Sequence, residues 1–174
     1  LPKGIRAELT LNRQPTVELD YKANHLMMLL ALHGVSLPTD PYIAIAEKTG
    51  CSREKVKDFI TKSLGAEDEA TAFNALKRSG FNLILFNAIK DGTLTVYPTL
   101  SSALFTGIGV NLQSLEGQIA LDIMYEGVKV GVPVLPVHDS FITSVDHEDW
   151  LREQMYAQWM KHVKQGVKTR IEKK

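Results

Sequence analysis

Apolar and polar positions alternate at the start of the chain, which predicts two extended runs. Ile5–Leu11 and Pro15–Asp20 are the two runs, and the short polar link between them indicates a hairpin. The alternation then gives way to leucines spaced by one and two helical turns, which predicts a helix that reaches His33 and stops at Gly34. Asp20 therefore marks the passage from a strand to a helix.

The middle of the chain shows the 3.6-residue spacing of apolar positions that is typical of helices. Ser52 is a suitable N-cap for a helix with Val56, Phe59 and Leu64 on its apolar face, which ends at Gly65. Further helices are predicted at residues 42–49, 67–78, 81–90 and 112–130, with a turn at 91–92.

The last third of the chain predicts a second hairpin and a final helix. Val132–Val137 and Phe141–Val145 are β-branched runs separated by a polar tip at residues 138–140. Asp146 is expected to cap an amphipathic helix, and the basic segment Lys164–Lys174 is assigned no element. The pattern as a whole predicts an α+β fold.

Composition limits the class of protein. A chain of 174 residues fits one compact domain, and Cys51 alone cannot form an internal disulfide, which favours a reducing, cytoplasmic setting. No apolar run approaches the roughly 18 residues that cross a bilayer, so we expect a soluble protein without a membrane partner. The 20 basic and 20 acidic residues argue against coating of nucleic acid by bulk charge. Because the sequence starts with Leu1, we expect a processed or excised piece of a longer protein.

Two aspartates and one pair of cations could carry chemistry. Asp20, at the end of a strand, and Asp139, at a hairpin tip, are carboxylates of the kind that bridge two divalent ions in phosphoryl transfer. Taken singly, each is more often a cap or turn residue. Arg53 and Lys57 lie one turn apart on one helix face, where a polyphosphate could bind, although an exposed basic face is the commoner meaning of such a pair.

The order of these residues resembles that of a known superfamily. Residues 17–21, Val-Glu-Leu-Asp-Tyr, followed by a leucine-rich helix, resemble motif A of the family A DNA polymerases. Arg53-x-x-x-Lys57, followed by Gly65, is similar to their motif B. Residues 137–141, Val-His-Asp-Ser-Phe, resemble motif C in the form that single-subunit, phage-type RNA polymerases carry, and residues 113–117 resemble the segment that precedes it there.

This resemblance implies a fold and a set of metal ligands. It implies a single palm-like domain over residues 1–174, with a small antiparallel sheet packed on helices and a short helical fingers insertion at residues 41–92. Asp20 and Asp139 would hold two Mg²⁺ ions, with the backbone carbonyl of Tyr21 as a further ligand.

The resemblance also implies substrate contacts. Arg53 and Lys57 would bind the triphosphate of an incoming nucleotide, and Lys57 would act as a general acid on the pyrophosphate. His138 would lie near the primer terminus, and Gln113 and Glu116 near sugar and base edges of primer or template. The implied protein is a DNA polymerase-like nucleotidyltransferase of DNA replication. Its partners would be primer-template nucleic acid, nucleoside triphosphates and further polymerase or replisome subunits.

Three departures from the family pattern affect these expectations. His25 stands where the DNA polymerases place a glutamate that screens the sugar 2′ position, so the choice of sugar stays open. Thr61 and Gly65 stand where aromatic residues are usual, which removes an expected stacking partner for the base. Ser140 replaces a carboxylate, and Glu18, on the same strand face as Asp20, could supply the missing charge.

Two other functions are compatible with the same residues. A metal-dependent nuclease would use Asp20 and Asp139 without nucleoside triphosphates. A degenerate palm would bind nucleic acid or a protein partner and catalyse nothing. The Arg53 and Lys57 pair favours the nucleotidyltransferase, because neither alternative needs a triphosphate contact.

Overall fold

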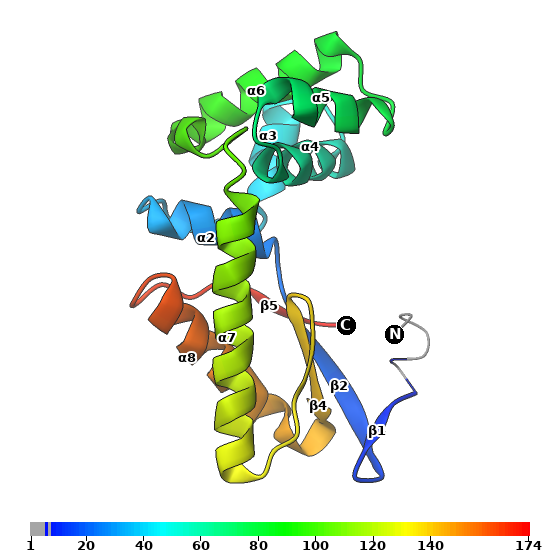
Figure 1. The fold of residues 1–174 in the computed structure, drawn as a ribbon, viewed down its shortest axis with the longest axis vertical. Coiled ribbons are helices and arrows are strands. Elements are labelled where there is room, and N and C mark those ends of the chain that lie inside the picture. Colours follow the sequence, from blue (N-terminus) through cyan, green and yellow to red (C-terminus); the bar gives the residue numbers. More distant parts are fainter. Residues whose placement is uncertain (1–5, 7) are drawn as a thin grey trace. The chain divides into compact units, whose positions relative to one another are not determined.

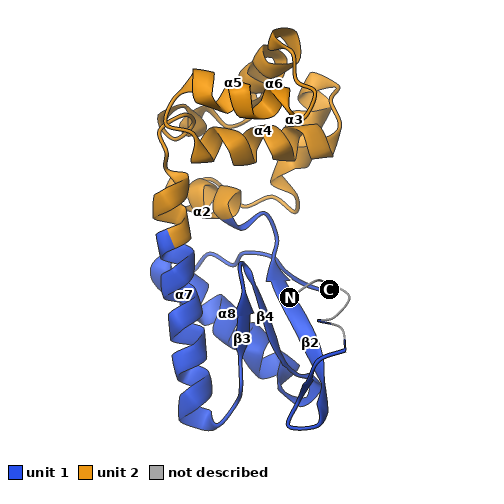
Figure 2. Ribbon diagram, turned by 45° about the vertical axis from the view of Figure 1, so that its right-hand side comes forward, with its two compact units in different colours: residues 1–24, 114–174 blue, residues 25–113 orange. Residues whose placement is uncertain are grey.

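The structure is a computed structural model that describes residue 6 and residues 8–174. The chain divides into two compact units, one made of residues 1–24 and 114–174 and the other of residues 25–113 (Figure 2). The first unit holds the β-sheet, and the second unit is helical. The insertion expected at residues 41–92 lies within the second unit, and its identity as a fingers insertion stays a prediction.

The sheet of the first unit is antiparallel throughout (Figure 1). Its strand order is β1-β2-β4-β3, and β5 pairs with β2 beside β1. Because β2 pairs with three other strands, it is the organising strand of this unit. The strands are β1 Thr10–Leu11, β2 Gln14–Tyr21, β3 Leu135–Val137, β4 Ser140–Ser144 and β5 Ile171–Lys173.

Both predicted hairpins are confirmed, although β1 and β3 are shorter and β2 is longer than the sequence pattern indicated. The first hairpin runs from Thr10 to Tyr21. Glu8 and Leu9 are outside its strands, and the other predicted strand positions 5 and 7 lie outside the described residues. In the second hairpin only His138 and Asp139 form the turn, because Ser140 already belongs to β4.

Alternate residues of β2 face opposite sides of the sheet. Val17, Leu19 and Tyr21 are buried, as is the apolar side of helix α8 (Glu148–His162), which packs on β2 and β4. Glu18 and Asp20 belong to the other alternating set, as the sequence indicated. The predicted N-cap role of Asp146 is wrong, since a short 3-10 helix at Val145–His147 leads into α8 and His147 stands at the cap position.

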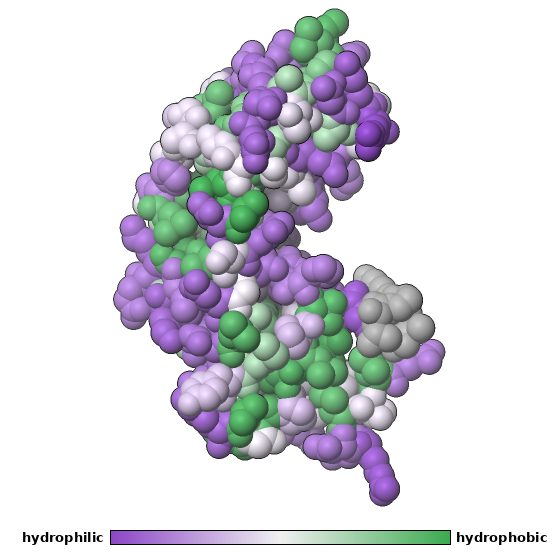
Figure 3. All heavy atoms as spheres, viewed as in Figure 1, coloured by the Kyte–Doolittle hydropathy of each residue, from purple (hydrophilic) through white to green (hydrophobic). Residues whose placement is uncertain are grey.

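Helix α7 (Gly109–Val130) confirms the long helix predicted from apolar spacing, and Ile119 and Ile123 are fully buried. Its outer side exposes large apolar side chains, among them Leu121, Tyr125 and Val128. Figure 3 shows hydrophobic atoms reaching the surface over this part of the first unit.

The second unit is built from short capped helices around an aromatic core. Phe59 and Phe86 meet edge to face with ring centroids 5.2 Å apart, and Phe73 meets Phe86 at the same distance. Ser52 caps α4 by accepting a hydrogen bond from the backbone N–H of Lys55, as predicted. The helices are α2 Asn24–Leu32, whose first residue belongs to the first unit, α3 Pro41–Thr49, α4 Arg53–Gly65, α5 Glu69–Lys77 and α6 Leu83–Val96, followed by a 3-10 helix at Pro98–Ser102.

The turn predicted at Asp91–Gly92 is wrong, because α6 continues through both residues. Gly92 is helical and buried, and a Cβ atom at this position would clash with the Cγ2 atom of Thr49 on α3. The glycine therefore allows close packing of α3 and α6 rather than a change of chain direction.

The α+β class predicted from the sequence is confirmed at this level. The described residues form a small antiparallel sheet and seven α-helices. Within residues 6 and 8–174, no helix is both long and apolar enough to span a bilayer.

Candidate active site

Strand pairing in the first unit brings the two predicted metal ligands to the same place. Asp20, near the end of β2, is paired in register with Ser140, the first residue of β4. Asp139 directly precedes Ser140, and its backbone carbonyl accepts a hydrogen bond of 3.1 Å from the N–H of Tyr21. Two aspartates that are far apart in the chain thus lie at one end of the sheet, Asp20 in β2 and Asp139 in the turn before β4.

The Asp139 carboxyl is in an environment that disfavours its charge. Burial raises its pKa to about 6, and the neighbouring negative charges of Asp20 and Glu116 act in the same direction. Lys174 opposes this shift only in part. Carboxylates crowded in this way are stabilised by a cation, and a raised pKa in such a cluster is typical of functional sites.

Glu18 is held by several donors on the same side of the sheet. Its Oε1 atom accepts hydrogen bonds from the Ser140 hydroxyl at 2.7 Å and from Arg6 at 2.8 Å. Burial alone would raise the pKa of Glu18, but the Ser140 hydrogen bond and the charges of Lys174 and Arg6 lower it overall. Glu18 is thus joined to the serine that replaces the family carboxylate, as the sequence suggested.

Among the described residues, Lys174 forms an ion pair with Asp20. Its Nζ atom lies 2.9 Å from Asp20 Oδ1 and 3.3 Å from Glu18 Oε1. The Oδ1 atom is enclosed by protein, and the ammonium forms an ion pair with it. Burial alone would lower the pKa of Lys174, but Asp20 and Glu18 raise it, so the lysine carries its charge here.

Tyr21 and His138, two further residues of the predicted site, lie in different surroundings. Tyr21 is buried in the core, and His138 is exposed in a turn. The Tyr21 side chain is buried, and its hydroxyl donates a 2.6 Å hydrogen bond to the Met155 carbonyl, so the metal contact through the Tyr21 backbone carbonyl stays a prediction. Burial raises the pKa of Tyr21 well above its usual value. His138 is exposed in the β3–β4 turn, where its φ of 55° lies in the left-handed region.

The charge of Glu116 acts on Asp139 together with that of Asp20. Glu116 lies on the part of α7 that contributes to the first unit, and its charge helps to raise the pKa of Asp139. Asn24 donates a 3.4 Å hydrogen bond to Glu116 and accepts one of 3.2 Å from the indole N–H of Trp159. The side chain of a buried asparagine therefore links Glu116 to helix α8.

Carboxylate and carbonyl oxygens are the ligands that Mg²⁺ prefers, so the donors at Asp20 and Asp139 fit a hard divalent cation chemically. The enclosed Asp20 Oδ1 atom already has a cation beside it, the Lys174 ammonium at 2.9 Å. Within the described part of the chain, however, no group of three or more His, Cys, Asp or Glu side chains is arranged to hold a metal. Further ligands would have to come from backbone carbonyls, water or substrate.

The predicted triphosphate residues lie in the second unit. Arg53 Nε donates to Asp40 Oδ2 at 2.7 Å, and its guanidinium carbon lies 5.1 Å from the centroid of the Tyr42 ring. The Asp40 contact uses Nε, and the other guanidinium nitrogens are the ones suited to bidentate phosphate binding. Asp40 also caps α3 through the N–H of Tyr42, so its carboxylate position is fixed from two sides.

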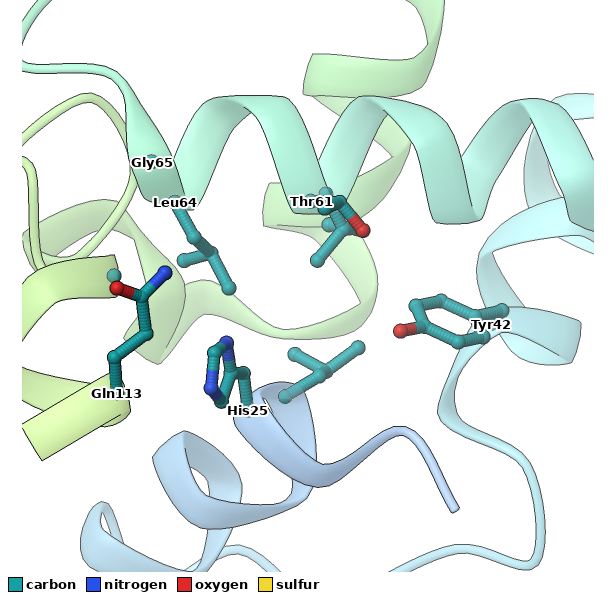
Figure 4. A pocket seen from close by; sticks show the side chains of 9 residues that line it. His25, Tyr42, Thr61, Leu64, Gly65 and Gln113 are labelled. Carbon is teal, nitrogen blue, oxygen red and sulfur yellow. The ribbon is translucent and has the colours of Figure 1, made fainter. Parts of the chain in front are cut away.

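Lys57 is exposed one turn further along α4, as the spacing predicted, and it forms no ion pair with residues 6 and 8–174. Thr61 and Gly65 continue the same row and line a pocket of about 140 Å³. His25 and Gln113 line this pocket as well and point into it (Figure 4). The second unit thus brings together four of the positions that the sequence selected.

The pocket has the size of one ring. A cavity of roughly 150 Å³ accommodates a six-membered aromatic ring. Leu26, Ile60 and Leu64 supply apolar walls, and Tyr42 completes the lining. Apolar walls with a few convergent polar groups are typical of small-molecule sites.

Sequence reasoning missed Asp40 and Lys174. The signal for Asp40 was its place before Pro41, typical of a helix N-cap, but nothing local links it to Arg53. Lys174 lies in a basic segment whose alternation, Thr169 to Lys173, is too short to predict a strand.

Comparisons with known proteins add no family assignment. No protein-family model matches the chain, and no curated protein matches it.

Proposed function

We propose that the chain is a template-directed nucleotidyltransferase of the DNA polymerase type, which adds nucleotides to a primer 3′ end. The observation that carries the proposal is the pairing of β2 with β4, which brings Asp20 beside Asp139 in the motif order that the sequence suggested. The raised pKa of Asp139 supports a site adapted to cations. A cytoplasmic location is part of the proposal.

The acidic residues would prepare the reacting groups. Asp20 and Asp139, with the Tyr21 carbonyl, would hold two Mg²⁺ ions, as carboxylates do in two-metal sites. When bound, these ions lower the pKa of the attacking hydroxyl and neutralise charge on the leaving oxygens. The primer 3′ oxygen would form a bond to the α-phosphorus while the bond from that phosphorus to the α–β bridging oxygen breaks, and pyrophosphate would leave.

Arg53, Lys57, Thr61 and Gly65 follow one another at one-turn spacing along α4. We call them the α4 row, and this row would bind the nucleotide. Arg53, held by Asp40, and Lys57 would contact the triphosphate, and Lys57 would donate a proton to the departing pyrophosphate. The row continues to Thr61 and into the pocket, which suits the sugar or base of the same nucleotide. His138, Gln113 and Glu116 would contact primer or template, and such a reaction depends mainly on positioning and charge stabilisation.

The test is extension of a labelled primer on DNA and RNA templates, with deoxy- and ribonucleotides offered separately in Mg²⁺. We expect incorporation by the wild type and a loss of about 10³-fold or more in Asp20→Asn and Asp139→Asn, because each removes a charge that stabilises the transition state. Asp146→Asn is the matched control, since Asp146 lies outside the site, and it should retain activity.

Other outcomes identify the alternatives. Cleavage of labelled DNA that depends on Asp20 and Asp139, without incorporation of either nucleotide type, would instead establish a nuclease. Equal binding of nucleic acid by wild type and both variants, with no metal requirement and no turnover, would establish a non-catalytic binder. Either result would overturn the proposal.

A further inference from the structure

We propose that Lys174 is a built-in counter-ion that occupies one of the two cation positions at Asp20 and must leave before a second divalent ion can bind. This inference rests on the proposed function, because it concerns the loading of the same carboxylates. It adds a residue outside the three motifs to the control of the site.

The Lys174 ammonium lies beside Asp20 at a position that a metal ion could otherwise occupy. It lies 2.9 Å from Oδ1 of Asp20, and this oxygen is enclosed by protein. A carboxylate that bridges two ions uses one oxygen for each. With Oδ1 covered by the ammonium, Asp20 would have only Oδ2 available for a metal ion.

The ammonium of Lys174 lies closer to Asp20 than to Glu18. Arg6 and Ser140 donate to Glu18 Oε1 at 2.8 and 2.7 Å, and the hydrogen bond that Lys174 donates to the same oxygen is longer, at 3.3 Å. Asp20 Oδ1 accepts no hydrogen bond, so the nearby ammonium supplies the compensating charge that a buried carboxylate oxygen requires.

The backbone holds Lys174 in position while the side chain can move. Strand β5 pairs with β2, with Lys173 opposite Leu19, and the N–H of Lys174 donates a 3.0 Å hydrogen bond to the Glu18 carbonyl. About 30% of the Lys174 side chain is exposed. A lysine side chain has a flexible stem, so the ammonium can turn to solvent without unpairing the strand.

Lys173, the last residue of β5, provides a matched comparison next to Lys174. Its ammonium pairs with Glu148 at 2.6 Å, away from Asp20. Alternate residues of a strand point to opposite sides, which explains why neighbouring lysines pair with different carboxylates. Removal of the Lys173 charge therefore controls for a general change in net charge.

The test is titration of the full chain with Mn²⁺ at neutral pH, with free Mn²⁺ followed by electron paramagnetic resonance. Wild type should bind one ion well and a second one weakly. Lys174→Met should tighten the second site by about tenfold, because it removes a cation at ion-pair distance. Lys174→Arg, which keeps the charge, and Lys173→Met should resemble wild type.

Each outcome separates the inference from the function on which it rests. Identical isotherms for wild type and Lys174→Met, or the same gain in Lys173→Met, would overturn the inference. In that case, loss of Mn²⁺ binding in Asp20→Asn would still support the metal site. If neither wild type nor Lys174→Met binds Mn²⁺, the metal site itself is refuted, and the inference with it.

Discussion

The acidic cluster of the first unit, which consists of Asp20 and Asp139 with the counter-ion Lys174, and the basic α4 row of the second unit are assembled in opposite ways. Asp20, Asp139 and Lys174 come from three distant segments, and strand pairing brings them together. Arg53 and Lys57 come from one helix, where the spacing of one turn alone places them on the same side.

This difference determines how each region responds to change. The acidic cluster is crowded with like charge, and the pKa of Asp139 rises as a result. The α4 row is open, with Lys57 exposed and Arg53 held by a single carboxylate partner at Nε. We expect substitutions in the cluster to change both stability and function, and substitutions in the row to change function alone.

Outside the acidic cluster, the largest effect on activity is expected at Lys57. Lys57→Ala should lower the kcat of primer extension by about 10²-fold, because it removes the proposed general acid and a phosphate contact. The urea midpoint of unfolding should stay unchanged, since the side chain is exposed. Lys62→Ala, on α4 but outside the row, is the control. An equal loss in both variants would contradict a specific role for Lys57 and weaken the contrast between the two regions.

The packing that supports α4 can be tested at Gly92. Gly92→Ala should lower the free energy of unfolding by about 1 to 3 kcal/mol, because its Cβ would clash with Thr49 Cγ2. Adding Thr49→Ser, which deletes that methyl group and keeps the hydroxyl bonded to Ile45, should restore most of the loss. The measurement is urea unfolding.

Gly117 is the matched control for Gly92. It is also helical, but a Cβ there meets no atom within 4 Å. Gly117→Ala should therefore stabilise the protein by up to about 1 kcal/mol, as expected for an open helical position. Equal destabilisation by both alanines would show that close packing of α3 and α6 is not the reason for Gly92.

The smallest effect, and the one that best defines the acidic cluster, is expected at Asp139. Its pKa is about 6 in the folded protein, above the ordinary value of 3.8. The folded state therefore binds more protons than the unfolded state between these pH values, so stability falls as pH rises through this window. Without metal, Asp139→Asn should be more stable than wild type by about 1 to 2 kcal/mol at pH 7.

The pH dependence provides the control for this prediction. The advantage of Asp139→Asn should shrink as pH falls from about 6 to 3.8 and be nearly absent at lower pH, where the wild-type carboxyl is protonated in both states. The measurement is urea unfolding at both pH values in the presence of a chelator. A variant less stable than wild type at pH 7 would show that the cluster is not strained by like charge.

Local signals predicted much of the fold. The Ser52 cap and the left-handed Gly50 gave correct ends for α4 and α3, because capping depends on neighbouring residues only. The turn prediction at Gly92 was wrong because a helical glycine that allows close packing has the same sequence signature as a turn glycine. Strand β5 was not predicted, because three mostly charged residues form a strand only when β2 is present to pair with them.

The candidate site was predictable to a similar degree. The α4 row followed from spacing, and the closeness of Asp20 and Asp139 followed from the motif order that suggested adjacent strands. The partners that adjust these groups, Asp40 and Lys174, were not predictable, because each pairing depends on tertiary contacts that leave no periodic pattern in the chain.

Strand β5 has a further consequence for how the sheet meets other molecules. On one edge of β2, β1 covers the first residues and β5 covers Leu19–Tyr21. An uncovered edge offers unpaired N–H and C=O groups to any extended chain, which leads to strand addition and aggregation. The short strand therefore protects the Asp20 end of β2 from intermolecular pairing, and its loss would turn this end into a template for self-association.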